Sequence, residues 1–134
     1  KLIDKAGKIA YLNEKDYYYR IRPNSIQTAS FNPKKLDLLD QLNVVKSIVQ
    51  TTYPSIINAY YSKEQSALFN LYMNISPDDT KEMLGIADDL WHGIKKNRIS
   101  VLKDREARPD ARIASLLSFL GSIPCRCVYK LVRK

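Results

Sequence analysis

The residues best suited to chemistry lie in the range Tyr17–Ile26, which brings tyrosine, arginine and serine close together. On an extended strand alternate side chains face opposite sides, so Arg20 and Arg22 share one face. A turn at Pro23–Ser25 would add free backbone amides and the Ser25 hydroxyl. Because guanidinium groups bind phosphate oxygens and turn amides complete anion sites, Arg20, Arg22 and Ser25 are candidates for binding a diphosphate. The alternative is an edge strand whose arginines extend into solvent.

Other catalytic and metal-binding sets are missing from the sequence. The single histidine, His92, excludes a histidine cluster and disfavours a Ser-His-Asp triad. Cys125 and Cys127 are too close in sequence to bridge comfortably, which favours a reducing compartment, and with one distant histidine they make a poor zinc site. The acidic doublets 78–79 and 88–89 would diverge on a helix. We therefore expect no metal site within this chain.

The charge of the chain is concentrated in its last third. The 134 residues include 22 Lys and Arg against 14 Asp and Glu, a net charge of +8. Residues 1–92 have 11 basic and 11 acidic side chains, whereas residues 93–134 have 11 basic and 3 acidic ones. Such a basic surface is typical of proteins that contact the phosphates of nucleic acid or of anionic lipid. No apolar run approaches the roughly 20 residues of a membrane-spanning helix.

The elements that must position these residues are predicted to be mainly α-helical. Residues 8–12 and 16–22 have the composition of two strands joined by a short polar turn, and thus predict an N-terminal β-hairpin. About five helices follow. Three of them are predicted to begin at prolines, in Asn32-Pro33, Tyr53-Pro54 and Ser76-Pro77, because proline is favoured in the first turn.

Two shorter helices are predicted at the end of the chain. The first has an apolar face with helical spacing and ends at Gly121; the face consists of Ile113, Leu116, Leu117 and Leu120. The second is a basic amphipathic helix in which apolar residues lie on one side. Its basic residues, which we expect to contact a membrane surface, are Arg126, Lys130, Arg133 and Lys134.

The order of these features resembles the end of family 2 glycosyltransferases, bacterial enzymes of capsule, exopolysaccharide and lipopolysaccharide assembly. The similarity begins with the apolar strand at 8–12 and the pattern Tyr-x-Tyr-Arg-x-Arg-x-x-Ser-Ile at 17–26. It continues through Phe31–Leu39, the Tyr53-Pro54 entry to the next helix, and the basic end that follows Ser115–Gly121. The resemblance therefore covers nearly the whole chain.

This resemblance implies the C-terminal part of a GT-A type enzyme that transfers a sugar from a nucleotide-sugar donor to a glycan or lipid-linked acceptor. Residues 1–31 would be the final strands and closing loop of the catalytic domain, and residues 32–134 a helical C-terminal region. Arg20, Arg22 and Ser25 match the positions that contact the donor diphosphate and gate the site. The family's Asp-x-Asp motif, which binds the metal and the nucleotide diphosphate, does not occur in this chain.

We accordingly expect this segment to be inactive by itself and to bind no cofactor, while the complete enzyme would use Mg²⁺ or Mn²⁺. The chain begins at Lys1 without an initiator methionine, and we expect a piece of a longer protein. Its partners would be the N-terminal catalytic half, the donor, the acceptor and an anionic membrane, at the cytoplasmic face of the cell membrane. Two alternatives remain open: a small nucleic-acid-binding module that uses residues 95–134, and a helical protein-interaction domain.

Overall fold

The computed structural model of the protein describes residues 5–14, 17–18, 20 and 31–132. The mainly α-helical class is confirmed, and the described residues contain no strand. In chain order the elements are η1 (Pro33–Leu36), α2 (Asp37–Thr52), η2 (Pro54–Ile56), α3 (Ile57–Asn74), α4 (Lys81–Lys103), α5 (Pro109–Leu117), η3 (Ser118–Leu120) and α6 (Ser122–Val132).

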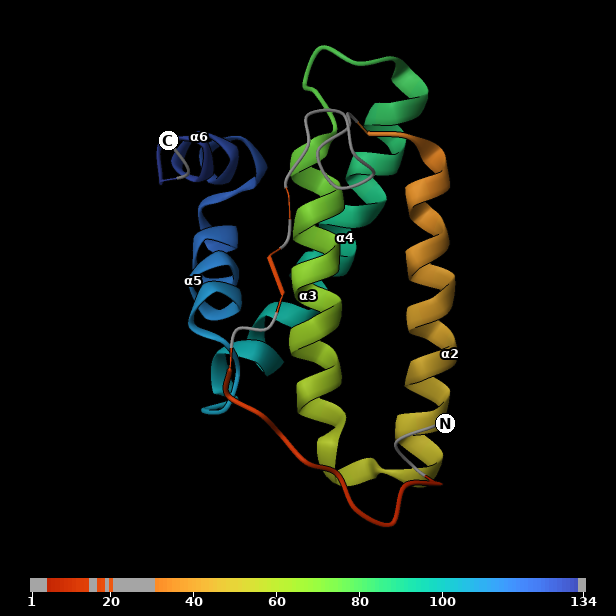
Figure 1. Cartoon of the computed structure of the whole chain (residues 1–134). Coiled ribbons are helices and arrows are strands. Elements are labelled where there is room, and N and C mark those ends of the chain that lie inside the picture. The colour runs from red at the N-terminus through yellow and green to blue at the C-terminus, as the bar shows by residue number, and fades with distance from the viewer. Residues whose placement is uncertain (1–4, 15–16, 19, 21–30, 133–134) are drawn as a thin grey trace.

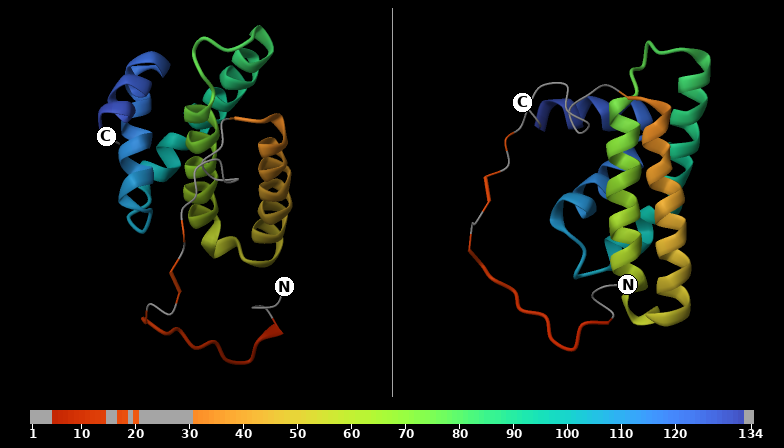
Figure 2. Two further views of the ribbon diagram at one scale, coloured as in Figure 1. Left: turned by 45° about the horizontal axis from the view of Figure 1, so that its top comes forward. Right: turned by 45° about the vertical axis from the view of Figure 1, so that its right-hand side comes forward.

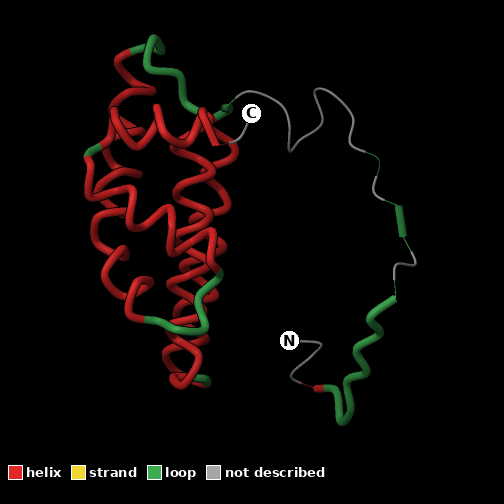
Figure 3. Tube along the Cα trace, turned by 90° about the vertical axis from the view of Figure 1, so that its left-hand side faces the viewer, coloured by secondary structure: helices red, strands yellow, loops and turns green. Residues whose placement is uncertain are grey.

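The predicted N-terminal β-hairpin is wrong. Residues 8–12 have irregular backbone, as do the residues of the second expected strand that the structure describes, namely 17, 18 and 20. Tyrosine favours a strand only where one face of the strand is covered. Tyr11 and Tyr18 are 87% and 93% exposed, so no packed face offsets the entropic cost of ordering an isolated hairpin. Figure 3 shows the described N-terminal residues apart from the helices.

Two of the predicted helix starts are confirmed. The Asn32 side-chain oxygen accepts a hydrogen bond from the Lys34 amide at 3.0 Å, and Pro33 is the first residue of η1. Pro54 likewise begins η2, which continues directly into α3. Both short 3₁₀ segments lead into long helices, because proline supplies a helical φ angle and loses no hydrogen bond in a first turn.

The third start lies later than predicted. Instead of opening a helix at Pro77, the Ser76 hydroxyl accepts a hydrogen bond from the Asp78 amide and forms a local turn. The helix α4 begins only after Thr80, whose hydroxyl accepts a hydrogen bond from the Met83 amide at 3.3 Å. Serine and threonine both cap helices and turns, so the sequence offered two possible starts four residues apart.

The main core lies between α3 and α4. Trp91 stacks against Tyr72 with their ring centroids 5.0 Å apart. Gly93 allows α3 to approach closely, since a Cβ atom at this position would lie 3.1 Å from the Leu68 Cδ1 atom. The buried members of this core cluster are Leu68, Phe69, Leu71, Tyr72, Ile75, Ala87, Leu90, Ile94 and Cys125.

The remaining helices pack on this pair from different sides. Figure 1 shows α2 and α5 on opposite sides of α3, with α6 near the end of α3, and Figure 2 gives the same arrangement from two further directions. On one side, Leu42 and Val49 of α2 contact Tyr60 and Ala67 of α3. The other side is built from smaller residues, in a cluster formed by Val101, Ala107 and Ala111.

Candidate functional site

Only one of the three candidate diphosphate-binding residues falls in the described part of the chain. Arg20 is exposed on the N-terminal segment, while Arg22 and Ser25 lie outside the described residues. The proposed assembly of the three side chains around a phosphate therefore stays a prediction from the sequence.

Of the predicted membrane contacts, Arg126 is the one whose side chain the structure describes; the side chains of Lys130, Arg133 and Lys134 lie outside it. The Arg126 guanidinium donates a hydrogen bond to the Ile75 carbonyl and stacks over the Tyr72 ring, 3.9 Å from its centroid. Ile75 is the C-cap residue that directly follows α3. Arg126 thus fastens α6 to the end of α3, and its membrane contact stays a prediction.

The apolar face that the sequence predicted for the segment of α5 and η3 lies largely on the outside. Three of its members, Ile113, Leu116 and Leu120, are 59%, 61% and 58% exposed. The residues buried instead are small: Ala111, Ser115 and Ser118. On a helical wheel these small residues lie opposite the large apolar ones. Leu117, at the edge between the two faces, packs partly against the main core.

A buried glutamine explains this orientation. Gln65 of α3 has no exposed surface, and its Nε2 atom donates hydrogen bonds to the Ile94 carbonyl at 3.3 Å and to the Ser115 hydroxyl at 3.0 Å. The Ser118 hydroxyl donates in turn to the Ser115 carbonyl at 2.6 Å. Burying a side-chain amide without hydrogen-bond partners costs free energy, so a small residue with a hydroxyl group must face Gln65. A leucine at this position could not accept the hydrogen bond from the Gln65 amide. Gln65 Oε1 itself has no partner among the described residues.

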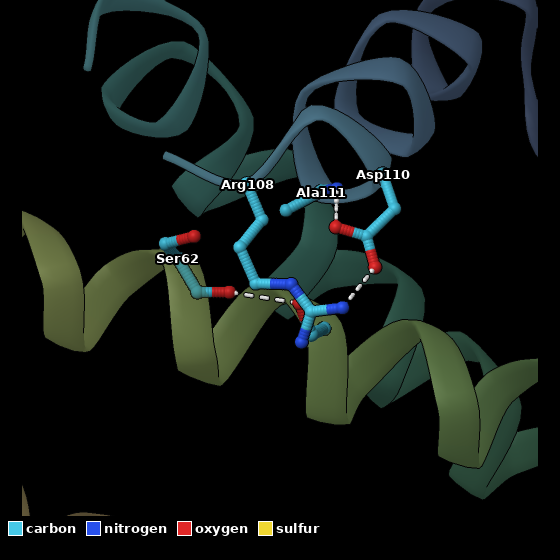
Figure 4. Close-up of polar contacts among 5 residues, drawn as sticks. Ser62, Arg108, Asp110 and Ala111 are labelled. Atoms are coloured by element: carbon cyan, nitrogen blue, oxygen red, sulfur yellow. Dashed lines mark hydrogen bonds and ion pairs between the residues drawn. The ribbon is translucent and has the colours of Figure 1, made fainter. Parts of the chain in front are cut away.

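The start of α5 carries a second polar arrangement, which Figure 4 shows. The Arg108 guanidinium lies 3.0 Å from the Asp110 carboxylate, and the other carboxylate oxygen accepts a hydrogen bond from the Ala111 amide. Both charged side chains are largely exposed. An exposed ion pair contributes little stability, so the main effect of Asp110 is to satisfy a free amide at the start of the helix.

A polar cleft of about 350 Å³ lies between α2, α3 and α4. At its floor the Glu64 carboxylate accepts hydrogen bonds from the Tyr60 hydroxyl at 2.8 Å and from the Asn97 amide at 2.6 Å. Lys46 lies about 6 Å from the Tyr60 ring, and His92 also lines the cleft. Because its two oxygens accept these hydrogen bonds from Tyr60 and Asn97, the Glu64 carboxylate joins α3 to α4.

The same contacts perturb Tyr60. Burial, reinforced by the hydrogen bond to Glu64, raises the pKa of the Tyr60 phenol above its usual value of about 10. Asn97 and Gln65 were not identified from the sequence as buried polar residues. In each helix a polar residue occupies an inward-facing position. A search for apolar periodicity does not detect such residues.

The cysteines are free thiols, with Cys125 buried and Cys127 exposed. Burial raises the pKa of the Cys125 thiol, which disfavours the reactive thiolate. Within the described ranges, no three histidine, cysteine or acidic side chains come together as metal ligands. Nor does any helix in the described part have the length and apolar character needed to cross a membrane.

Comparisons with known proteins identified no related protein. No family model matches the sequence, and no match was found among the curated proteins or the solved structures. The arguments for function therefore come from the residues and from the geometry described above.

Proposed function

We propose that the chain is the C-terminal part of a family 2 glycosyltransferase, which transfers a sugar from a nucleotide-sugar donor to a glycan or lipid-linked acceptor. The sequence pattern at 17–26 and the order of the later features support this assignment. The donor-binding half, with its Mg²⁺ or Mn²⁺ ion, would lie in the same protein outside this chain. In that enzyme Arg20, Arg22 and Ser25 would bind the donor diphosphate.

The observation that carries the proposal is the exposure of the N-terminal segment. Ile9, Tyr11, Leu12, Tyr17 and Tyr18 are all large side chains that lie mostly in solvent. Burying such groups is strongly favourable, so this series of exposed aromatic and aliphatic side chains supports a contact with another part of the protein. The catalytic half of the proposed enzyme would cover this surface, and the resemblance places that half next to this segment.

The helical region would attach the enzyme to an anionic membrane on its cytoplasmic side. The +8 charge of residues 93–134 supports this role, because each basic residue near an anionic surface contributes about 1 kcal/mol. Lipid-linked acceptors lie at such a surface, so attachment would bring the active site to its substrate. This charge alone would give a salt-sensitive attachment.

Sugar transfer by the complete enzyme tests the assignment. We expect the enzyme to release nucleoside diphosphate from a nucleotide sugar, and Arg22→Ala and Ser25→Ala to slow this release about tenfold to a hundredfold, because the leaving diphosphate loses a positive charge in the first variant and a hydrogen-bond donor in the second. Lys63→Ala, which removes an exposed positive charge on α3, is the matched control and should turn over normally. Parental rates in both site variants would refute the donor-site assignment, and a complete protein without donor turnover would refute the function.

Binding experiments separate the membrane role from the nucleic-acid role. We expect the 134-residue chain to sediment with anionic vesicles at low salt and to bind duplex and single-stranded DNA only weakly. Tight DNA binding together with no vesicle binding would contradict the membrane role and favour a nucleic-acid-binding module.

A further inference from the structure

The large apolar residues of α5 and η3 form a surface that the protein itself does not cover. We define the outer face as Ile113, Leu116 and Leu120, which follow one another at three and four residues and so lie on one side of the helix. All three are more than half exposed. A contiguous apolar surface of this kind on a soluble domain is characteristic of an interaction site.

The orientation of this face is fixed by the opposite side of α5. Ser115 is held by the hydrogen bond from Gln65, and Ala111 and Ser118 pack into the bundle. Turning the helix to bury the leucines would place large side chains against Gln65 and would remove its hydrogen bond. The exposure of the outer face is therefore a consequence of the packing of the bundle.

Positive charge lies at the border of the outer face. Arg112 is exposed and precedes the first member of the face. The Arg98 guanidinium stacks over the Phe119 ring at 3.9 Å and donates a hydrogen bond to the Ser118 carbonyl at 3.4 Å. Phe119 is half exposed beside it. Aliphatic side chains bordered by arginines match the two layers of an anionic lipid surface, acyl chains below and phosphates above.

Charge also distinguishes between the partners that could cover the outer face. A second copy of this chain would bring another strongly basic segment against residues 93–134, and like charges would repel. Nucleic acid would satisfy the arginines but would leave the leucine and isoleucine side chains in water. An anionic bilayer offers phosphates to the arginines and acyl chains to the leucine and isoleucine side chains.

We propose that the outer face of α5 and η3 inserts into the boundary between headgroups and acyl chains of an anionic membrane, with Arg98 and Arg112 at the level of the phosphates. This inference rests on the membrane attachment in the proposed function and extends it, because attachment by charge alone would not need the outer face. It assigns the apolar contact to Leu116 and Leu120, which are distinct from the basic residues expected at the end of α6.

Vesicle binding by matched variants tests the proposal. The outer-face variant is Leu116→Ser with Leu120→Ser, and the control is Val44→Ser with Ile56→Ser, which changes side chains that are 61% and 50% exposed on α2 and η2. Partitioning into phosphatidylglycerol vesicles is measured by co-sedimentation at low and at physiological salt. We expect a loss of about tenfold for each outer-face leucine, about a hundredfold in the double variant, and no loss in the control.

The outcomes distinguish this inference from the proposed function. Equal vesicle binding by the outer-face variant and the parent would refute insertion and leave attachment by charge. Absence of vesicle binding by the parent would refute both insertion and attachment, while donor turnover would still decide the enzymatic assignment. If light scattering shows a dimer of the parent that the outer-face variant loses, the face is a contact between copies of the chain and insertion is refuted. Circular dichroism of all variants shows whether each is folded.

Discussion

Two helix contacts in this protein bury opposite kinds of side chain, large apolar ones in one contact and small ones in the other. Between α3 and α4 the large apolar side chains face inward, and Ile75, Leu90 and Ile94 are almost completely buried. Where α5 meets the same bundle, the inward side chains are Ala111 and Ser115, while leucines and an isoleucine face outward. Both regions show the same helical periodicity in the sequence. The comparison teaches that periodicity identifies the apolar face of a helix, whereas the neighbouring residues decide whether that face is buried.

The largest difference between the two contacts should appear on truncating a large side chain in each. Ile94→Ala removes a fully buried side chain and should lower the free energy of unfolding by about 2–5 kcal/mol. Leu116→Ala removes an exposed one and should change it by less than about 0.5 kcal/mol. Urea denaturation followed by circular dichroism measures both. A loss from Leu116→Ala as large as that from Ile94→Ala would show that the outer face is buried in solution.

Filling the small-residue contact should also be costly. Ser115→Leu puts a large side chain into a site with no exposed surface and removes an acceptor from Gln65. Overpacking and the lost hydrogen bond together should cost about 2–4 kcal/mol in the free energy of unfolding. Ile113→Leu, on the exposed face of the same helix, is the matched control and should be neutral. A Ser115→Leu variant as stable as the parent would mean that α5 has turned its other face inward.

The basic third contains one arginine that is bonded to the fold, Arg126, and an exposed one, Arg112. Replacing each of them should change the free energy of unfolding by different amounts, and this difference is smaller than those above. Arg126→Ala removes the hydrogen bond to the Ile75 carbonyl and the stacking on Tyr72, and should cost about 1–3 kcal/mol of stability. Arg112→Ala removes the same charge from an exposed position and should cost less than about 0.5 kcal/mol. Thermal unfolding of both variants at equal salt provides the measurement. Equal losses would argue against the role of Arg126 in fastening α6.

The smallest effect concerns pH and the contact between α2, α3 and α4. The pKa of Tyr60 is raised in the folded protein, so the unfolded chain loses this proton first, near pH 10. The free energy of unfolding should therefore fall as the pH rises above about 10, and it should fall less in Tyr60→Phe. Denaturation of both proteins between about pH 8 and pH 11 tests this. Parallel profiles would show that the phenol is not protected by burial and by Glu64.

Those parts of the fold that depend on local chemistry could be predicted from the sequence. The Asn32 cap and the helix starts at Pro33 and Pro54 act within a few residues, so their signals survive without a structure. The hairpin could not be predicted correctly, because a strand requires a partner and a covered face that Tyr11 and Tyr18 do not have. Which side of α5 faces inward could not be predicted, because it depends on Gln65, fifty residues away.

The candidate functional residues also divide into features that the sequence reveals and features that only the structure reveals. A basic C-terminal third is visible in composition alone, but the sequence cannot tell which arginine is free and which is bonded to the fold. Arg126 belongs to the second kind, since its partner is a backbone carbonyl far along the chain. The outer face of α5 was visible in the sequence as an apolar pattern, but the pattern alone did not show whether this face is buried.

The attachment of α6 also affects how the protein opens locally. This helix is held by the Arg126 contact, by the buried Cys125 and by a 3.5 Å hydrogen bond from the Tyr72 hydroxyl to the Ser122 carbonyl. Both hydrogen bonds are made to Tyr72 and Ile75, at the C-terminal end of α3, so α6 can detach while most of the α3–α4 core stays packed. In native-state hydrogen exchange the amides of α6 should therefore exchange through a sub-global opening, well before those around Ile94.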